Sequence, residues 1–459
     1  MSKILRKLTC LILAAACLAG GAACVKLPEV NNDFTFDPDT VDPATLTGTV
    51  SVWWAPMDYM WEPMERAIEK FNKQYPNVTI DLIKKTRADY YDDLNLAFAN
   101  GTAPDVVRLD HVYVQSLGES GRVLDLTKMT GGKVEINEEE QFIDQTWQAM
   151  RIGEHQYGFP LESNTTLFMY NETICEEVFG PDYTPPTTFE ELCEQSLQVR
   201  AYEKDGENPY HGFIMPINAS NSQHDMYVIN GWMARFGASL LNDERTECTL
   251  NTPEAIEAFR TMQDAADSGA IEYTGYAPYL ENQFIYDGTV AFIEMGSWIY
   301  NDVKGMDLNL DGESDIKVAA IPSTTEGIPG YATLGSSGLC INSTCKDENK
   351  IAAYEFIRFC ATDYETHMDF AKEMKVFPSL EAGLEDPYYH EPNESDPNWV
   401  EYWDIFMDQL LISVPRPGTK FWPEITTKLK YAEYKLVDGG QSPEKVANDV
   451  TADINKLFR

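Results

Sequence analysis

The chain has 459 residues and carries 74 acidic against 35 basic side chains, which gives a formal net charge of −39. Hydrophobic residues make up 43% of the chain, enough to bury a large core, so the acidity does not indicate a disordered protein. A charge this negative repels phosphate backbones and anionic lipid head groups, and we expect no nucleic-acid partner. The length is typical of two or three domains.

The N-terminus has the pattern of a secretory signal. Three basic residues precede an almost entirely apolar run at 8–19, which is too short to span a bilayer, since that takes about 20 residues. The run ends in Gly21-Ala22-Ala23-Cys24, small residues before a cysteine, which resembles a bacterial lipoprotein cleavage site. We expect residues 1–23 to be removed and Cys24 to carry a lipid anchor on the outer face of the cell membrane. Lipidation at Cys17 and a plain secretory signal are the alternatives.

Residues 24–48 are rich in Asp, Asn, Thr and Pro and lack apolar periodicity, so we expect a flexible tether between the anchor and the folded domain. After Cys24 the chain has six further cysteines, at positions 175, 193, 248, 340, 345 and 360. An even number is compatible with disulfides in an exported protein. A chain of this size does not need them, and buried free thiols are an equal alternative.

From residue 49 onward, strand and helix patterns alternate. The sequence predicts strands at 49–54, 78–83 and 105–109 and helices at 62–75 and 90–100. This order indicates right-handed βαβ units and a parallel sheet. Ligands of such open sheets bind beyond the carboxyl ends of the strands, which lie here at Trp54 to Asp58 and at Asp110-His111.

The later segments continue the α/β pattern. Strands are predicted at 167–170, 290–293 and 316–321, and helices at 188–200, 253–268, 350–362 and 442–458. Thr188 is the expected N-cap of its helix. Strand patterns fade after about residue 345, so the C-terminal part is predicted to be mainly helical.

A series of short motifs occurs in an order that resembles the extracellular solute-binding proteins of ABC importers, the branch that contains maltose-binding protein. Each motif is weak alone, but together they extend over residues 49–458. They are Val50-Ser51-Val52-Trp53-Trp54, Phe71-Asn72 with Pro76, Ala99 to Val107, Gly121 to Thr127, Tyr157 to Pro160 with Tyr170-Asn171, Pro185 to Leu192, Asp287 to Phe292 with Gly296-Ser297-Trp298, and Ala352 to Ile357.

The resemblance implies an α/β, two-lobed periplasmic-binding-protein fold of type II, in which each lobe is a mostly parallel sheet flanked by helices. By position, residues 49–160 and 320–375 form the first lobe, and residues 161–319 and 376–459 form the second. The ligand lies between the lobes, which close by hinge motion.

The resemblance further implies a monomeric, lipid-anchored receptor that captures a carbohydrate, expected to be an oligosaccharide, and delivers it to the membrane permease of an ABC transporter. No catalysis and no required cofactor are expected. The alternatives are a receptor of this fold for a polyamine or another cation, and a secreted glycoside hydrolase. Such an enzyme needs a pair of carboxylates, and acidic residues are abundant enough here to supply that pair by chance. Ferric-ion receptors of this fold use adjacent tyrosines, and Tyr388-Tyr389 is such a pair, but it lies outside the matching region.

A sugar site needs flat apolar faces for the rings and carboxylates or amides for the hydroxyls. Strand ends and crossover positions supply most candidates, and the resemblance adds Trp298 and Trp422 as stacking residues. The predicted ligand-binding residues are Trp54, Asp58, Asp110, His111, Glu162, Asn164, Trp298, Gly335, Ser336 and Trp422. Core packing, helix caps and turns are the structural alternatives. The family receptor's own tryptophan and acid–base pair in this region fall on Leu109, Val112 and Tyr113, a departure that leaves the specificity open.

One acidic loop follows the spacing of an EF-hand calcium loop. Oxygen-bearing residues stand at every second position before and after Gly312, but the twelfth position is Val318 instead of Glu. The alternative is an acidic surface turn. A structural calcium site is predicted from Asp307, Asn309, Asp311, Glu313 and Asp315.

Overall fold

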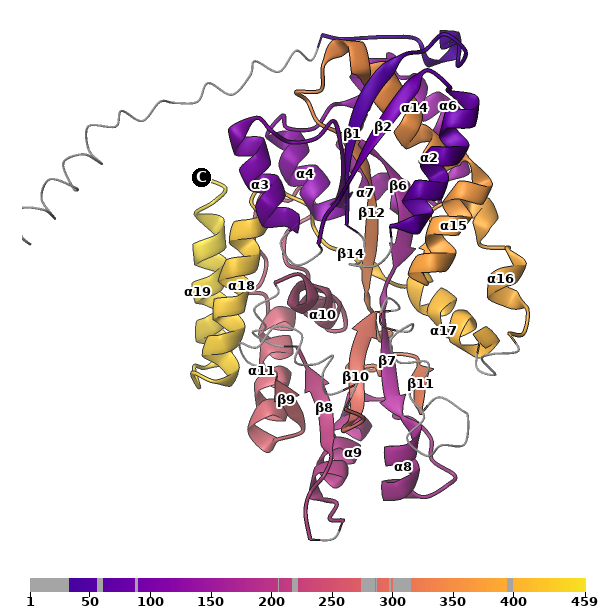
Figure 1. Ribbon diagram of the computed structural model, residues 1–459. Coiled ribbons are helices and arrows are strands. Elements are labelled where there is room, and N and C mark those ends of the chain that lie inside the picture. Colours follow the sequence, from indigo (N-terminus) through magenta and orange to yellow (C-terminus); the bar gives the residue numbers. More distant parts are fainter. Residues whose placement is uncertain are drawn as a thin grey trace, which may run out of the picture.

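The computed structural model describes residues 33–55, 61–86, 90–204, 206–216, 222–273, 285, 287–296, 299, 315–393 and 399–459. These residues form two lobes, each built around its own β-sheet (Figure 1). The two-lobed α/β fold predicted from the sequence is confirmed. Within these ranges, no helix has the length and apolar character needed to cross a membrane.

The sheet of the first lobe has the strand order β13-β6-β12-β3-β1-β2, and a short strand, β14, pairs with β12. Strand β1 pairs with β2 and β3 in parallel, as the βαβ prediction requires, while β12 is antiparallel to β3 and β6. The strands are β1 (Gly48–Trp54), β2 (Val78–Lys84), β3 (Val106–Asp110), β6 (Gly158–Asn164), β12 (Thr333–Ile341), β13 (Phe377–Pro378) and β14 (Val414–Pro415).

Helices cover both faces of this sheet. The periodicity that predicted α2 (Glu62–Gln74) buries Met64, Ala67 and Phe71 on one side of the helix, facing the core of the lobe. The other helices of this lobe are α3 (Tyr90–Asn100), α4 (His111–Glu119), α5 (Leu126–Thr130), α6 (Lys133–Glu138), α7 (Asp144–Ala149), α14 (Asp347–Thr362) and α15 (Tyr364–Met374). A small hairpin of β4 (Arg151–Ile152) and β5 (His155–Gln156) lies beside α4.

The sheet of the second lobe has the strand order β11-β7-β10-β8-β9. Strand β7 is antiparallel to β10 and β11, whereas β8 is parallel to β10 and β9. The strands are β7 (Thr166–Asn171), β8 (His211–Met215), β9 (Ile271–Tyr273), β10 (Val290–Gly296) and β11 (Ile316–Ala319). Both sheets are therefore mixed, because the strands that join the lobes run against their neighbours.

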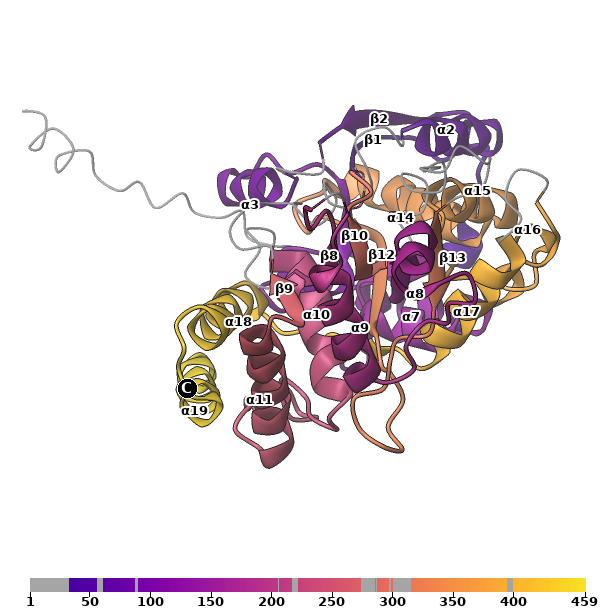
Figure 2. The ribbon, with the colours of Figure 1, turned by 90° about the horizontal axis from the view of Figure 1, so that it is seen from below.

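Helices from distant parts of the chain surround the second sheet, either on the sheet itself or on the helices that cover it. They are α8 (Glu172–Phe179), α9 (Phe189–Ala201), α10 (Ser222–Ala234), α11 (Pro253–Ser268), α18 (Trp422–Val437) and α19 (Pro443–Asn455). Thr188 is the N-cap of α9, as predicted, and forms a capping box with Glu191. Figure 2 shows α11, α18 and α19 on one flank, and α15, α16 (Pro387–His390) and α17 (Trp399–Leu411) on the opposite flank.

Three segments join the lobes. Strand β6 of the first sheet continues through Thr165 into β7 of the second, and β12 follows β11 back to the first sheet. After α17, which packs on β7 and β11, the chain pairs with the start of β12 as β14 before it enters α18. The Thr165 hydroxyl donates to the Thr333 carbonyl, and the Asn230 amide donates to the carbonyl of Val414, so the joining segments are held together by hydrogen bonds.

The prediction of a flexible tether is wrong for its second half. Phe34 and Phe36 pack against the core of the first lobe, and the Phe36 ring meets Tyr354 edge to face at 5.2 Å. The Phe36 amide donates to the Met129 carbonyl, and Lys133 pairs with Asp39. The polar composition of the segment conceals these two aromatic residues, which stand two positions apart. Residues 24–32, with Cys24, lie outside the described residues.

The structure decides between the two expectations for the cysteines. The six cysteines after Cys24 are free thiols, and five of them are buried. Burial in an apolar environment raises the pKa of each of these thiols, so they are protonated packing residues.

Candidate ligand-binding site

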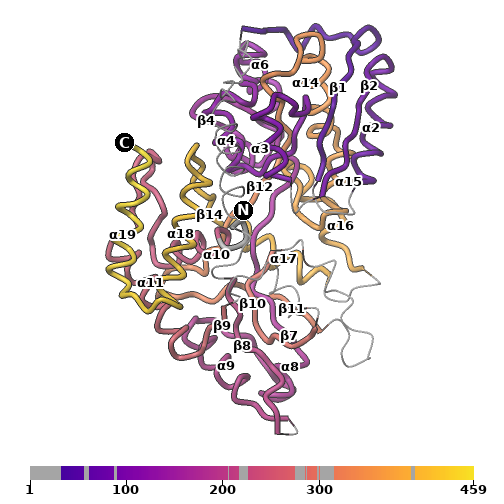
Figure 3. The backbone as a smooth tube through the Cα atoms, turned by 60° about the vertical axis from the view of Figure 1, so that its left-hand side comes forward, coloured from indigo at the N-terminus to yellow at the C-terminus, as the bar shows by residue number. Residues whose placement is uncertain are grey.

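The carboxyl ends of the parallel strands of the two lobes face each other across the joining segments. Strand β6 runs toward the second lobe, so β3 and β1, on the other side of the antiparallel β12, run the same way. Strand β7 runs away from the first lobe, so the antiparallel β10 and its parallel neighbour β8 end toward it. Figure 1 shows the arrowheads of β8 and β10 directed at the upper lobe. Topology therefore brings both sets of strand ends to one region (Figure 3).

Four predicted residues lie on adjacent strands in this region. Ser337 of β12 is in register with Asp110 of β3 on one side and with Glu162 of β6 on the other. Gly335 is in register with Asn164. We call Asp110, Glu162, Asn164 and Gly335, together with Arg108, Arg416 and Tyr227, the floor of the site. Its side chains are at most 9% exposed, so the floor is closed over in this structure.

Each carboxylate of the floor is paired with an arginine. The Nη2 of Arg416 contacts both oxygens of Asp110, at 2.8 and 2.7 Å, and Arg108 pairs with Glu162. Burial alone raises the pKa of Asp110, but the Arg416 guanidinium, together with smaller contributions such as that of the Val112 amide, holds that pKa below its ordinary value. The floor therefore contains two pairs of opposite charge and has no net charge. Four ionised groups can be buried together only when their charges are paired in this way.

His111, the first residue of α4, is also buried beside the floor. Its Nδ1 lies 3.4 Å from an Asp110 oxygen, and Asp110 caps the helix by accepting from the Val112 amide. Burial lowers the pKa of His111 to about 4, and the ring is neutral at physiological pH. Ser336, on the neighbouring β12, is fully buried as well.

The second lobe contributes Tyr227 of α10 to the floor. Its hydroxyl donates to Asn164 Oδ1 at 3.2 Å, and the Arg416 guanidinium stacks on its ring at 4.1 Å. Gly335 makes this contact possible, because a Cβ at that position would lie 2.1 Å from both Asn164 Oδ1 and the Tyr227 hydroxyl. One chain of contacts, from Asp110 through Arg416 and Tyr227 to Asn164, thus spans both lobes.

The prediction that Trp54 and Trp422 stack on the ligand is wrong. Trp54 and Trp422 are 0% exposed and have no free ring face: Trp54 packs on Phe370 in the first lobe, and Trp422 lies in the core of the second. Trp53, on the opposite face of β1, is the partly exposed member of its pair and carries Lys85 over its ring at 4.0 Å. Asp58 and Trp298 lie outside the described residues.

The structure adds floor residues and aromatic faces that the sequence reasoning missed. Tyr91 and Tyr113 stack at 3.8 Å with both rings partly exposed, and the Tyr91 hydroxyl accepts from the Asp110 amide. Arg108 was detectable as a charge two residues before Asp110 in an otherwise apolar strand. Arg416, between two prolines, gave no comparable signal, because its partner is 306 positions away.

The described residues offer no assembled metal centre: no three His, Cys, Asp or Glu side chains are gathered to hold an ion. Of the predicted calcium ligands, Asp307, Asn309, Asp311 and Glu313 lie outside the described residues. Asp315 is buried, and its carboxylate accepts a hydrogen bond from the Thr173 hydroxyl. Its backbone carbonyl accepts a hydrogen bond from the Glu172 amide. Both contacts fix the start of α8. Tyr389, of the candidate ferric pair, is fully buried among aromatic rings, and its hydroxyl donates to the Val376 carbonyl.

Known proteins match this chain over most of its length. The maltotriose-binding protein of Pyrococcus abyssi is 24% identical over 74% of this chain and 68% of its own length. The maltodextrin-binding protein MdxE of Bacillus subtilis is 23% identical over 98% of this chain and 97% of its own length. An ABC substrate-binding protein of Listeria monocytogenes, solved with cycloalternan, superposes with a TM-score of 0.73 at 20% identity, over 90% of this chain and 99% of that one.

The profile of a protein family matches residues 66–396, which include the carboxyl ends of β3, β8 and β10 and most of the floor. Its members bind solutes and do not transform them, so the hydrolase alternative is not retained. The chain belongs to the bacterial extracellular solute-binding protein family.

Proposed function

We propose that this protein captures a neutral oligosaccharide between its lobes and delivers it to the permease of an ABC importer. The observation that carries the proposal is the charge-balanced floor, with partly exposed tyrosine rings beside it. Sugars are neutral and bind through hydrogen bonds and stacking, so such a site suits them. The two curated relatives described above are named for maltotriose and maltodextrin, which supports the same class of cargo.

The floor does not favour a cationic cargo. A polyamine needs carboxylates that are free to pair with its ammonium groups, whereas Asp110 and Glu162 already pair with Arg416 and Arg108. An organic phosphate is disfavoured by the same argument, because both guanidinium groups are engaged.

A thermal-shift panel separates these classes of cargo. We expect α- and β-linked neutral oligosaccharides to include at least one that raises the melting temperature, while spermidine, ferric ion and glycerol phosphate leave it unchanged. A ligand at about 100 times its Kd adds about 2.7 kcal/mol to the stability of the folded state, which is easily measured. A shift with spermidine and with no saccharide would reject the proposal.

We also propose that Cys24 carries the lipid anchor, on the strength of the small residues before it and the apolar run upstream. Cys24→Ser is expected to release the protein from membranes into the medium, measured by blotting both fractions. The matched Cys17→Ser variant is expected to stay membrane-bound. The reverse pattern would move the anchor to Cys17.

Calcium binding by the loop from Asp307 to Asp315 stays a prediction. Its support is the alternation of oxygen-bearing residues around Gly312. Asp315 already accepts a hydrogen bond from the Thr173 hydroxyl, so replacing it would disturb more than a calcium site. Asp311→Ala is therefore a more informative variant than Asp315→Ala. A chelator should lower the melting temperature of the wild type but not that of Asp311→Ala, and an unchanged wild type would reject the site.

A further inference from the structure

A crevice of about 580 Å³ lies between the lobes beside the second half of α4. The first lobe lines it with Gln115 and Glu119 of α4 and with the tip of the β4–β5 hairpin. The second lobe lines it with residues 244–246, 419–421 and 457–459. None of the floor residues contributes to its walls. It lies on the flank where α4 approaches α18 and the C-terminal end of the chain (Figures 1 and 3).

The walls of the crevice combine apolar faces with hydrogen-bonding groups. Phe421 and Phe458 are partly exposed and meet edge to face at 5.4 Å, with Ile152 and Leu457 nearby. A volume of 580 Å³ is within the range of small-molecule sites. Apolar ring surface beside polar groups is what one face of a pyranose and its hydroxyls require.

The charges of the crevice are of both signs. Glu119 and Glu244 supply acceptors, and Arg245, Lys420 and Arg459 supply donors, while the Gln115 amide, Thr246 and Thr419 do both. A ligand with a net charge would meet a repelling group on some wall. Hydroxyls donate and accept at the same atom, so a neutral polyhydroxylated molecule is the class that satisfies these walls.

One charged residue of the crevice is held in place by a rigid loop. Arg245 has a φ of 56°, in the left-handed region that a residue with a side chain rarely adopts. Asn242 fixes the loop: its carbonyl accepts the Arg245 amide, and its Oδ1 accepts the amides of Thr246 and Glu247. Strain of this kind persists where the surroundings over-determine a conformation, and here it directs Arg245 across to the other lobe.

The crevice walls also connect the lobes directly. Arg245 Nη1 donates to Gln115 Oε1 at 2.7 Å, and Ser116 donates to the Lys420 carbonyl at 3.4 Å. Gly418 leaves room for Gln115, since a Cβ there would lie 2.2 Å from the amide carbon of that side chain. A movement of one lobe relative to the other therefore changes the shape of the crevice.

We propose that this crevice is a second carbohydrate-binding site, separate from the floor. The class of ligand rests on the proposed function, while the location rests on the crevice itself. Because its walls belong to different lobes, a saccharide bound there has a different affinity for open and closed arrangements. By reciprocity it shifts the affinity of the floor for its own cargo.

The test uses the full mature chain and isothermal titration with a panel of neutral α- and β-linked oligosaccharides from three to seven units. Thr246→Trp places an indole in the crevice from an exposed loop position, and Thr79→Trp, exposed on β2 of the first lobe, is the matched control. We expect two binding events in the wild type and in Thr79→Trp. Thr246→Trp is expected to lose the weaker event and to change the Kd of the stronger one.

Hydrogen exchange of the wild type gives a reading that does not depend on how the variant folds. Saturating saccharide is expected to protect the amides of residues 242–247 from exchange. This protection should appear at a different saccharide concentration from the protection of the amides that follow the strand ends. A single binding event that Thr246→Trp leaves intact, with no protection at 242–247, overturns the second site and leaves the proposed function standing. Absence of any saccharide binding overturns both.

Discussion

Replacing Arg416 with methionine is expected to lower the free energy of unfolding by about 3–5 kcal/mol, because it leaves Asp110 as an unpaired charge in the interior. Arg416 is 1% exposed and Asp110 6%, and both contacts of the guanidinium Nη2 are to Asp110 oxygens. Methionine keeps much of the side-chain length over Tyr227, so the loss reports the charge more than the packing. Urea denaturation of the purified chain at neutral pH measures it.

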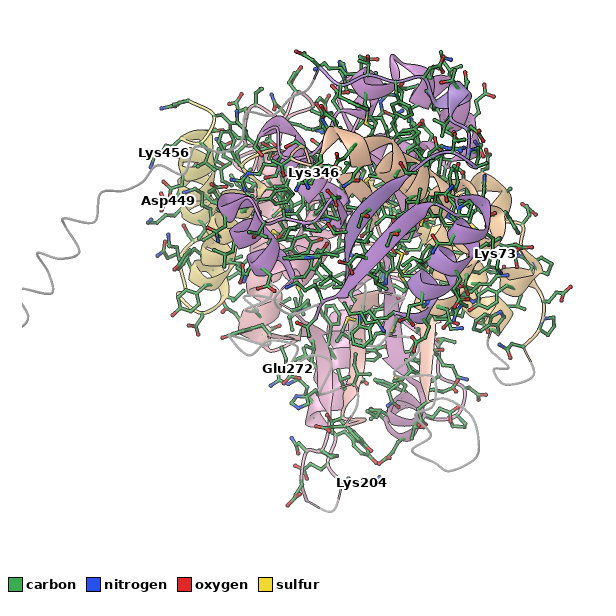
Figure 4. The ribbon with its side chains drawn as sticks, turned by 45° about the horizontal axis from the view of Figure 1, so that its top comes forward. Lys73, Lys204, Glu272, Lys346, Asp449 and Lys456 are labelled. Atoms are coloured by element: carbon green, nitrogen blue, oxygen red, sulfur yellow. The ribbon has the colours of Figure 1, made fainter. Side chains whose placement is uncertain are left out.

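The double variant Arg416→Met with Asp110→Asn tests the cause. Asparagine retains the cap that Asp110 gives to the Val112 amide but has no charge, so it should restore part of the lost stability. The control is Lys456→Met, at the C-cap of α19 (Figure 4), because the ion pair of Lys456 with Asp453 is largely exposed. Exposed pairs contribute about 0–1 kcal/mol, so little change is expected there. A loss below about 1 kcal/mol in Arg416→Met would contradict a buried pair.

Much of the fold could be predicted from the sequence, because local periodicity and topology determine it. The spacing of Met64, Ala67 and Phe71 predicts one helix, and the right-handed βαβ rule places the strand ends of each lobe at one edge. The antiparallel run of the joining strands was not predicted, since strand patterns carry no direction. Phe34 and Phe36 were missed because two aromatic residues in a polar segment do not reveal the core that receives them.

The site, like the fold, has one part that local sequence patterns predict and another part that they do not. Asp110 and Asn164 end their strands, and Glu162 and Gly335 lie two residues from a strand end, so these four residues meet at positions that a sequence can indicate. Trp54 was predicted wrongly because alternation puts Trp53 and Trp54 on opposite faces of β1 without saying which face is buried, and the buried face is that of Trp54. Arg416 and Tyr227 reach the floor through contacts between distant segments, and no local pattern records a partner 306 residues away.

Acidification is expected to destabilise the protein before its carboxylates titrate, because two buried histidines are neutral in the folded state. Burial lowers the pKa of His367 to about 3 and that of His111 to about 4, while an unfolded histidine titrates near 6.5. Between these values the unfolded chain binds protons that the folded chain does not. The contribution is therefore complete above pH 6.5 and is lost as the pH falls, by up to about 1.4 kcal/mol per unit for each histidine.

His367→Gln isolates one of these histidines. The ring Nε2 accepts the Ser379 amide at 2.8 Å and the Leu380 amide at 3.3 Å, and glutamine offers an acceptor that does not titrate. We expect the slope of unfolding free energy against pH, measured by urea denaturation between pH 6 and 4.5, to fall by about 1.4 kcal/mol per unit. His390→Gln, at an exposed position, should leave the slope unchanged. An identical slope in His367→Gln and the wild type would mean that His367 takes up its proton in the folded state, which its burial opposes.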